Sequence, residues 1–357
     1  MTEAPLRIAC ALGPLPAGLA IVYGAWAAVL LIVSISNAIG PEVWWPGSAN
    51  LYVPQAIWGA PALAVVPWTL LKARRWIVVC ALMLLWVFEP LMGWVCNPVT
   101  PSLRPGGVEI RVMQCNVKWA RRDPRGLAEE VARQQPDIIQ FQDSGGTIDK
   151  LGPIAGVLAD WNIVGHLQYI TATRYPVADY RYIGISKAGG ESQGCTRLVV
   201  LIGHTQVALY NVHLLTPRWG LDSVRARDIS GLSSNVAERL YEARRLADLI
   251  RGDSLPVLLT GDLNAPIQSF VCRSIAADGL SDAFQNAGNG YGYSYGRFAI
   301  EPILDKFGLA NMAAPYVRID HIFYSKQWTA VKCWTGSDSL SDHVPVYADL
   351  YLSPSKE

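Results

Sequence analysis

Residues 258–264 read Leu-Leu-Thr-Gly-Asp-Leu-Asn, and this stretch decides how the rest of the sequence is interpreted. The apolar run from Leu255 to Leu259 predicts a buried strand that stops at Gly261. Asp262 and Asn264 follow two residues apart, so in extended backbone both side chains project to one face. A carboxylate that can accept a proton would then lie beside a carboxamide that can donate to an oxygen. Ligands bind at such strand ends in open α/β sheets, although Asp-x-Asn also occurs in plain turns.

The composition indicates that part of the chain lies in lipid. The 357 residues are 51% hydrophobic and 17% charged, whereas soluble domains carry about 25% charged residues. Many of the 13 tryptophans lie near the apolar N-terminal stretches, as belts at a membrane interface require. The formal net charge is +1, and basic and acidic residues balance beyond Cys96. This balance provides no electrostatic footprint for strong non-specific DNA binding.

Residues 1–96 predict a membrane region with about three transmembrane helices. The apolar stretches lie at about 17–35, 51–71 and 76–95, and prolines make the second the weakest span. The basic tetrapeptide at 72–75 precedes the third stretch, and the positive-inside tendency places it in the cytoplasm. We therefore expect everything after residue 96 to lie outside the cytoplasm.

Proline and glycine mark residues 97–107 as a linker, and residues 108–357 predict one α/β domain. Seven cysteines are present, and no pair has the spacing of metal ligands. An extracytoplasmic compartment would permit a disulfide such as Cys272–Cys333.

Polar residues follow six strand-like runs of this domain. One such residue alone indicates little, because a lone Asp is usually a turn former or helix cap and a lone His is usually structural. Six strand-terminal positions together are hard to explain by capping alone. The set comprises Asn116, Asp143, His213, Asp262 with Asn264, Asp320, and Asp342 with His343.

Three motifs in this order resemble the endonuclease/exonuclease/phosphatase family, which includes deoxyribonucleases and sphingomyelinases. They are Gly-Asp-Leu-Asn at 261–264, Arg-Ile-Asp-His-Ile-Phe at 318–323 and Ser-Asp-His-Val-Pro-Val at 341–346. The resemblance implies a four-layer sandwich in which two packed β-sheets are flanked by helices. The whole chain is similar to membrane-anchored bacterial members. That likeness implies an inner-membrane protein whose catalytic domain is periplasmic.

The resemblance also implies a site that binds a divalent metal. Asp143 and Asp342 would be metal ligands, with Asn116 alongside. Mg²⁺ is the expected ion, with Mn²⁺ as the alternative, because Mg²⁺ prefers oxygen ligands and needs only one or two carboxylates. The family usually has Glu where this chain has Asp143. Because aspartate is shorter by one methylene, the departure affects the expected metal affinity more than the expected reaction type.

The remaining roles implied by the resemblance concern acid–base chemistry and the phosphate. His343 would act as base or acid, aligned by Asp320, while Asp262 would orient or deprotonate the attacking water. The sequence leaves open whether His343 or Asp262 is the base. The expected phosphate contacts are Asn264, Asn116 and His213, which would also aid the leaving group. Apart from the resemblance, Arg197 is a further candidate for a phosphate contact, with a solvated arginine at a strand end as the alternative.

The leading hypothesis is a membrane-anchored, metal-dependent phosphoesterase that cleaves a phosphodiester or phosphomonoester, with a lipid headgroup favoured. A membrane-tethered nuclease and a catalytically weak binding module are the alternatives. The expected partners are a phosphate-ester substrate and the lipid bilayer, with no obligate protein partner. Arg and aromatic residues in 216–235 and 288–315 would form a rim for a headgroup or a stacked base.

Overall fold

The computed structural model describes residues 13–187, 193–277, 279–338 and 340–354. The chain divides into two compact units, Met1–Trp94 and Val95–Glu357. Each unit has its own hydrophobic core.

The first unit is helical. Helix α2 (Ala17–Ile39) is, within the described part of the chain, the one helix long and apolar enough by length and composition to cross a membrane. The Tyr23 hydroxyl, on α2, lies 3.0 Å from the Thr69 hydroxyl on a neighbouring helix. The other helical segments are η1 (Pro41–Val43), α3 (Trp45–Asn50), η2 (Gln55–Gly59), α4 (Ala62–Lys72), η3 (Arg74–Trp76), α5 (Ile77–Trp86) and the π-helical η4 (Val87–Leu91).

The second and third apolar stretches therefore do not form single long α-helices. Pro54 and Pro61 come directly before η2 and α4, and Pro67 lies inside α4. Proline lacks the N–H that a helix interior needs and clashes with the preceding turn. In the third stretch, α5 passes into a π-helical turn that contains Pro90. Helix α2 alone among the described helices passes on length and hydropathy, and the number of spans stays a prediction.

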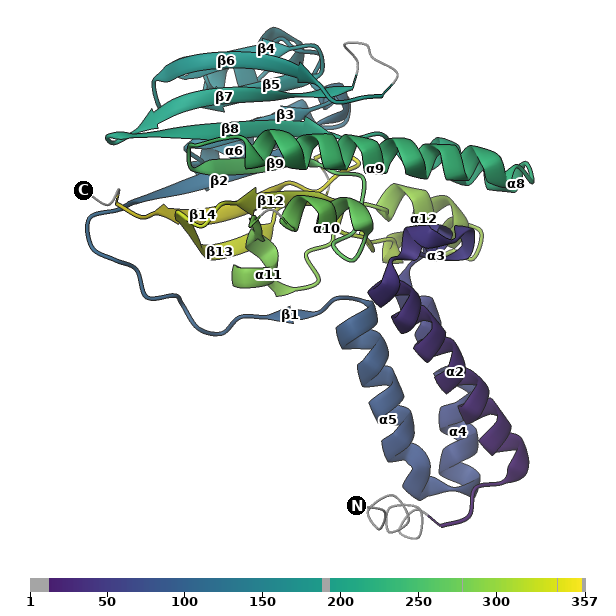
Figure 1. Cartoon of the computed structure of the whole chain (residues 1–357). Coiled ribbons are helices and arrows are strands. Elements are labelled where there is room, and N and C mark those ends of the chain that lie inside the picture. Colours follow the sequence, from purple (N-terminus) through teal and green to yellow (C-terminus); the bar gives the residue numbers. More distant parts are fainter. Residues whose placement is uncertain (1–12, 188–192, 278, 339, 355–357) are drawn as a thin grey trace. The chain divides into compact units, whose positions relative to one another are not determined.

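Two six-stranded mixed sheets form the centre of the second unit (Figure 1). The first sheet has the order β10-β12-β9-β8-β7-β6 and the second β13-β14-β2-β3-β5-β4. Pairs β8–β9 and β2–β3 are parallel, and the other pairs are antiparallel. The strands are β2 (Val108–Asn116), β3 (Ile138–Gln142), β4 (Asn162–His166), β5 (Tyr169–Thr173), β6 (Val177–Gly184), β7 (Gly194–Ile202), β8 (Thr205–His213), β9 (Val257–Asp262), β10 (Ser281–Asp282), β12 (Asp320–Tyr324), β13 (Trp328–Thr335) and β14 (Val346–Leu352).

Helices cover the outer faces of both sheets. The 23-residue helix α9 runs alongside the first sheet (Figure 1) and shares one core with α10. Helices α6 and α7 pack on the second sheet around another core. This arrangement confirms the expected fold of the domain, two packed sheets between helices. The helical segments are η5 (Lys118–Ala120), α6 (Pro124–Gln134), η6 (Ile148–Leu151), α7 (Ile154–Val157), α8 (Arg218–Arg225), α9 (Ile229–Arg251), α10 (Phe270–Ala276), α11 (Ala283–Ala287), α12 (Arg297–Asp305) and η7 (Ala310–Met312).

The layer between the sheets changes from apolar to polar along the strands. Alternate residues of a strand face one side. On β9, Leu258 lies in the apolar core between the sheets, whereas the Thr260 hydroxyl donates to Gln140 of the facing sheet at 2.7 Å. Asp262 is the next residue on that side and ends the strand. Burial of the apolar residues holds the sheets together at about 25 cal/mol per Å². The polar residues then emerge at one end of the sandwich.

The segment after the first unit is attached to the second. Strand β1 (Val95–Cys96) pairs with β11 (Asn289–Gly290), and the Asn97 side chain donates to the carbonyls of Gln285 and Gly288. Farther along, the Tyr351 hydroxyl donates to the Arg104 carbonyl and accepts from the Gly107 amide at 2.7 Å. The predicted linker is thus held by hydrogen bonds near both of its ends.

Cys272 and Cys333 do not form the disulfide that the sequence permitted. Both are free and buried. The Cys272 thiol lies beside the carbonyl of Ala265, and Cys333 packs in the core between the sheets.

Candidate active site

Asp262 lies at the centre of the polar end of the sandwich. Its Oδ2 accepts from the Asn116 side-chain amide at 3.1 Å. The Nε2 atoms of His213 and His343 lie 3.5 Å and 3.6 Å from the same oxygen. Burial is the main cause that raises the pKa of Asp262, while the neighbouring imidazoles oppose the shift. A carboxylate with a raised pKa is better suited to take a proton near neutral pH.

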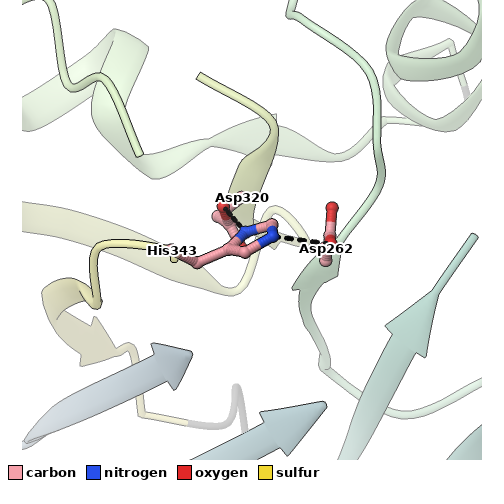
Figure 2. A group of neighbouring side chains, drawn as sticks. All are labelled: Asp262, Asp320 and His343. Atoms are coloured by element: carbon pink, nitrogen blue, oxygen red, sulfur yellow. Dashed lines mark hydrogen bonds and ion pairs between the residues drawn. The ribbon is translucent and has the colours of Figure 1, made fainter. Parts of the chain in front are cut away.

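His343 lies between two carboxylates (Figure 2). Its Nδ1 donates to Oδ2 of Asp320 at 2.8 Å, which fixes the ring orientation and leaves Nε2 facing Asp262. Burial lowers the pKa of His343, but Asp320 and Asp262 outweigh burial and raise the pKa to about 9. The imidazole is therefore set to carry a proton at neutral pH. Such a group can stabilise a negative oxygen or protonate one.

The Gly-Asp-Leu-Asn turn brings Asp262 into place through two local features. A Cβ on Gly261 would lie 1.9 Å from the carbonyl oxygen of Val212, so β9 can approach β8 only with glycine there. Asn264 has a φ of 51°, a left-handed conformation that asparagine tolerates better than most residues. Its backbone amide donates to Oδ1 of Asp262 at 2.8 Å, and its side chain donates to the Leu214 carbonyl at 2.9 Å.

Asp342 and Asp143 flank the left-handed turn η5. The Lys118 ammonium lies 3.0 Å from Oδ2 of Asp342, and the Trp119 amide donates to the backbone carbonyl of Asp143 at 2.6 Å. Lys118, Trp119 and Ala120 have φ angles of 47°, 62° and 47°. Left-handed backbone costs roughly 1–2 kcal/mol per non-glycine residue. A partly exposed ion pair contributes at most about 1 kcal/mol, so the Lys118–Asp342 pair alone does not account for this turn.

Arg197 lies outside this group, and its expected phosphate contact is not supported by its position. Its guanidinium forms a two-pronged ion pair with Asp253 at 2.6 Å and 3.1 Å. Asp253 also accepts from Tyr210, which packs on the helix-covered face of the first sheet. In the register of β7 against β8, Arg197 lies opposite Tyr210. Tyr210 precedes His213, the last residue of β8, by three residues. The arginine therefore faces the helices and joins the sheet to the loop after α9.

The two segments predicted to form a rim meet next to His343. The Arg218 guanidinium donates to the Tyr295 hydroxyl at 3.0 Å. The Tyr295 ring centroid lies 4.7 Å from that of His343. An aromatic ring thus lies beside the His343 imidazole, and its hydroxyl accepts a hydrogen bond from a cationic side chain.

Two glutamines that the sequence reasoning missed support the site. Buried Gln114 donates to Oδ1 of Asp320 at 2.8 Å and to Gln142 at 2.7 Å. The side-chain oxygen Oε1 of Gln168 lies 2.6 Å from Nδ1 of His213. Gln114 precedes Asn116 by two residues on β2, so the period of two marks it as sharing a face with the site. No comparable signal identifies Gln168, which lies outside a strand.

Helix α9 holds the two loops that follow His213 and Asp262. Arg239 is buried, and its guanidinium donates to the carbonyls of Leu215 at 3.1 Å and Asn264 at 2.6 Å. The Glu242 carboxylate accepts from the Leu215 amide at 2.8 Å. Burial raises the pKa of Glu242 to about 7.

The replacement Glu242→Gln is expected to change how stability depends on pH. Because the folded-state pKa is raised above the unfolded value, the stability associated with protonated Glu242 is full below about pH 4.5 and falls as the pH rises through about 7. The shift from 4.5 to about 7 corresponds to roughly 3–4 kcal/mol at 1.36 kcal/mol per unit. Glutamine keeps the acceptor for Leu215 and carries no charge. Urea unfolding should find the variant more stable than the parent at pH 8.5 and equal to it at pH 4.5. The exposed control Glu129→Gln should show no such change of relative stability with pH. A difference in unfolding free energy between Glu242→Gln and the parent that stays constant with pH would contradict the raised pKa of Glu242.

Two sets of donors are candidates to hold a divalent cation, one that the geometry brings together and one that was predicted from the sequence. Within the described residues, Asp262, Asp320 and His343 offer ligand atoms that lie within 4.8 Å of one another. The second set is the oxygen set predicted from the sequence, Asn116, Asp143 and Asp342. In the described part of the chain the Asp143 carboxylate makes no hydrogen bond or ion pair, so it is available to a cation. Oxygen-only donors suit Mg²⁺, whereas the nitrogen of His343 suits Mn²⁺ or a softer ion.

The fold and this cluster together define a class, α/β sandwiches with an acid–histidine group at one end of two packed sheets. The chain belongs to the Endonuclease/Exonuclease/phosphatase family, whose sequence profile matches residues 113–343. Enzymes of this family hydrolyse phosphoester bonds and usually use a divalent metal.

Solved structures share the fold at low sequence identity. A family protein from Bacteroides thetaiotaomicron is 16% identical over 71% of this chain and 97% of its own, with a TM-score of 0.52. A humanized D. rerio TDP2 is 15% identical over 69% of this chain and 99% of its own, also with a TM-score of 0.52. The mannosyl-6-phosphatase of B. thetaiotaomicron is 16% identical over 68% of this chain and 99% of its own, with a TM-score of 0.50. A search of curated proteins found no match.

Proposed function

We propose that the protein is a divalent-metal-dependent phosphoesterase that hydrolyses a phosphodiester, with a lipid headgroup as the favoured substrate class. The observation that carries the proposal is Asp262, whose Oδ2 is faced by Asn116, His213 and His343. Ester hydrolysis needs a proton acceptor for water and donors for the developing negative oxygens. Asp262 supplies the acceptor, while the protonated His343 and the amide of Asn116 supply donors.

A divalent ion held by Asp143, Asp342 and Asn116 would neutralise charge on the phosphate when bound. The remaining work falls to side chains. Asp320 and Gln114 fix the ring of His343, so its Nε2–H points toward Asp262 and the space beside it. His213, oriented by Gln168, is placed to protonate the leaving oxygen. Asp262 orients the attacking water and takes its proton.

The lipid preference rests on the chain as a whole. Helix α2 is long and apolar enough to anchor the protein in a bilayer. The near-neutral charge gives little attraction for a polyanion such as DNA. The basic residues at 72–75 favour an orientation with the catalytic unit on the extracytoplasmic side. Arg218 and Tyr295 would contact the headgroup beyond the scissile phosphate.

The test is a substrate panel with the purified full chain and Mg²⁺ or Mn²⁺. The panel contains a phospholipid in vesicles, duplex DNA, a phosphorylated sugar and a chromogenic phosphodiester. We expect hydrolysis that chelation abolishes, with the phospholipid cleaved most efficiently. Cleavage of DNA alone would instead support a tethered nuclease, and no hydrolysis of any phosphoester would overturn the proposal. Labelling of exposed Cys96 in intact cells by an impermeant maleimide, in a Cys10→Ser background, checks the orientation.

A further inference from the structure

The turn η5 places a lysine next to the candidate metal ligands. It follows β2 directly, and the Lys118 amide donates to the side-chain oxygen of Asn116 at 3.1 Å. The Val117 amide donates to the Gln142 carbonyl at 3.0 Å, and the Trp119 amide donates to the Asp143 carbonyl. The turn is therefore fixed to the ends of both β2 and β3. These bonds keep three residues in a left-handed conformation that none of their side chains favours.

Asp342 follows a residue that is hydrogen-bonded to β2, whereas the side chain of its lysine partner is half-exposed. The Ser341 hydroxyl donates to the Asn116 carbonyl at 2.8 Å and lies 3.3 Å from Oδ1 of Asp342. Oδ2 of Asp342 faces the Lys118 ammonium. The lysine side chain is 49% exposed and that of Asp342 is 21% exposed. A long side chain with a partly hydrated ammonium can exchange one oxygen partner for another at little cost.

We propose that Lys118 is a phosphate-contacting residue of the active site. Its ammonium pairs with Asp342 in the free protein and moves to a non-bridging oxygen of the phosphate when substrate binds. That move exposes Oδ2 of Asp342 to the cation. This inference rests on the proposed function, because it assigns a further contact within the same site.

The charges explain why a lysine is placed here. Asp143 and Asp342 both border the turn η5, so the proposed metal ligands carry two negative charges, and a phosphodiester adds another. One divalent cation balances the carboxylates alone. The Lys118 ammonium supplies the positive charge that the substrate then requires, and lysine binds phosphate oxygens as a point charge.

The test is ligand binding to the full chain in detergent, with inorganic phosphate and Mn²⁺ as probes. Lys118→Met keeps the length of the side chain and removes its charge. We expect the variant to bind phosphate at least 10-fold more weakly in the presence of Mn²⁺. Its affinity for Mn²⁺ without phosphate should stay the same or rise, because Asp342 loses a competitor. Lys118→Arg should restore most of the phosphate affinity.

Lys150→Met is the matched control. The Lys150 ammonium lies 5.9 Å from the Trp119 ring centroid but donates to the Gly145 carbonyl at 3.0 Å, so it borders the same turn without facing Asp342. This control should leave both affinities unchanged. Unaltered phosphate binding in Lys118→Met would overturn the proposal. So would a loss of Mn²⁺ affinity alone, since that result would mean that Lys118 merely supports Asp342. These measurements need no turnover, so they can fail independently of the proposed hydrolysis.

Discussion

The replacement Asp262→Asn is expected to lower kcat for a chromogenic phosphodiester by about 10³-fold, within the range that general acid–base groups contribute. Asparagine matches the shape of aspartate, so its carbonyl oxygen can still accept from the Asn264 amide. The lost function is the ability to take a proton from water between His213 and His343. KM should change little, because the phosphate is bound by other groups. Steady-state kinetics in Mg²⁺ measure both constants.

Stability measurements separate this loss from unfolding. Burial raises the pKa of Asp262, so neutral asparagine should leave the melting temperature equal to or above that of the parent. Asp179→Asn is the control, because the Asp179 side chain on β6 is 41% exposed and its ion pairs are with arginines away from the site. Retention of more than a tenth of the parent kcat in Asp262→Asn would remove Asp262 from the role of base and leave that role to His343.

Much of the candidate site follows from the period of two in extended chains. His213 and Asp262 end neighbouring strands of the first sheet, and Asn116 ends β2 of the facing sheet. Asp320 begins the strand next to Asp262. The register of β12 against β9 pairs Asp320 directly with Asp262. Side chains remote in sequence therefore meet because each follows the same alternation at one end of the sandwich. The alternation along the strands thus accounts for the positions of these side chains, while their catalytic roles stay a proposal.

Arg197 shows where that reasoning fails. Strand β7 is apolar on both faces, since Leu198 packs between the sheets and Cys195 packs under the helices. A strand covered on both sides lacks the alternation that would reveal which way a given residue points. The position of Arg197 near polar strand ends suggested a phosphate contact. Its partner Asp253 could be identified only once β7, β8 and the loop after α9 were placed together.

The sequence did not predict the conformation of the turn η5 or the helix boundaries of the first unit, for different reasons. Three successive non-glycine residues with positive φ carry no sequence signal, because each alone would be expected elsewhere in φ/ψ space. The turn is imposed by hydrogen bonds to β3, which the local sequence does not contain. In the first unit, hydropathy predicted the apolar stretches, but Pro54 and Pro61 precede the helical segments η2 and α4, and Pro90 lies in the π-helical turn after α5.

The replacement Asp282→Ala is expected to reduce the free energy of unfolding by about 3–5 kcal/mol, as measured for one partner removed from a buried ion pair. Both carboxylate oxygens of Asp282 accept from Nη1 of Arg318, at 3.0 Å and 2.8 Å, and Oδ2 lies 2.9 Å from Nδ1 of His321. All three residues are buried. Alanine would leave the guanidinium without its counter-charge and would also remove the cap that accepts from the Gln285 amide at the start of α11.

The pH dependence of stability provides a second readout for Asp282. Burial raises the pKa of this carboxyl, but Arg318 and His321 more than reverse the effect and hold it well below its usual range. Because the folded-state pKa is depressed, the ion pair stabilises the protein above the unfolded value of 3.8, and this stability is lost as the pH falls further. Urea unfolding at pH 7 and pH 3.5 should therefore show a smaller difference between variant and parent at the lower pH. The control Asp222→Ala breaks an exposed pair with Arg225 and should cost less than about 1 kcal/mol at either pH. An equal loss of unfolding free energy in the two variants would contradict this prediction. It would show that the buried position of Arg318 and His321 does not depend on Asp282.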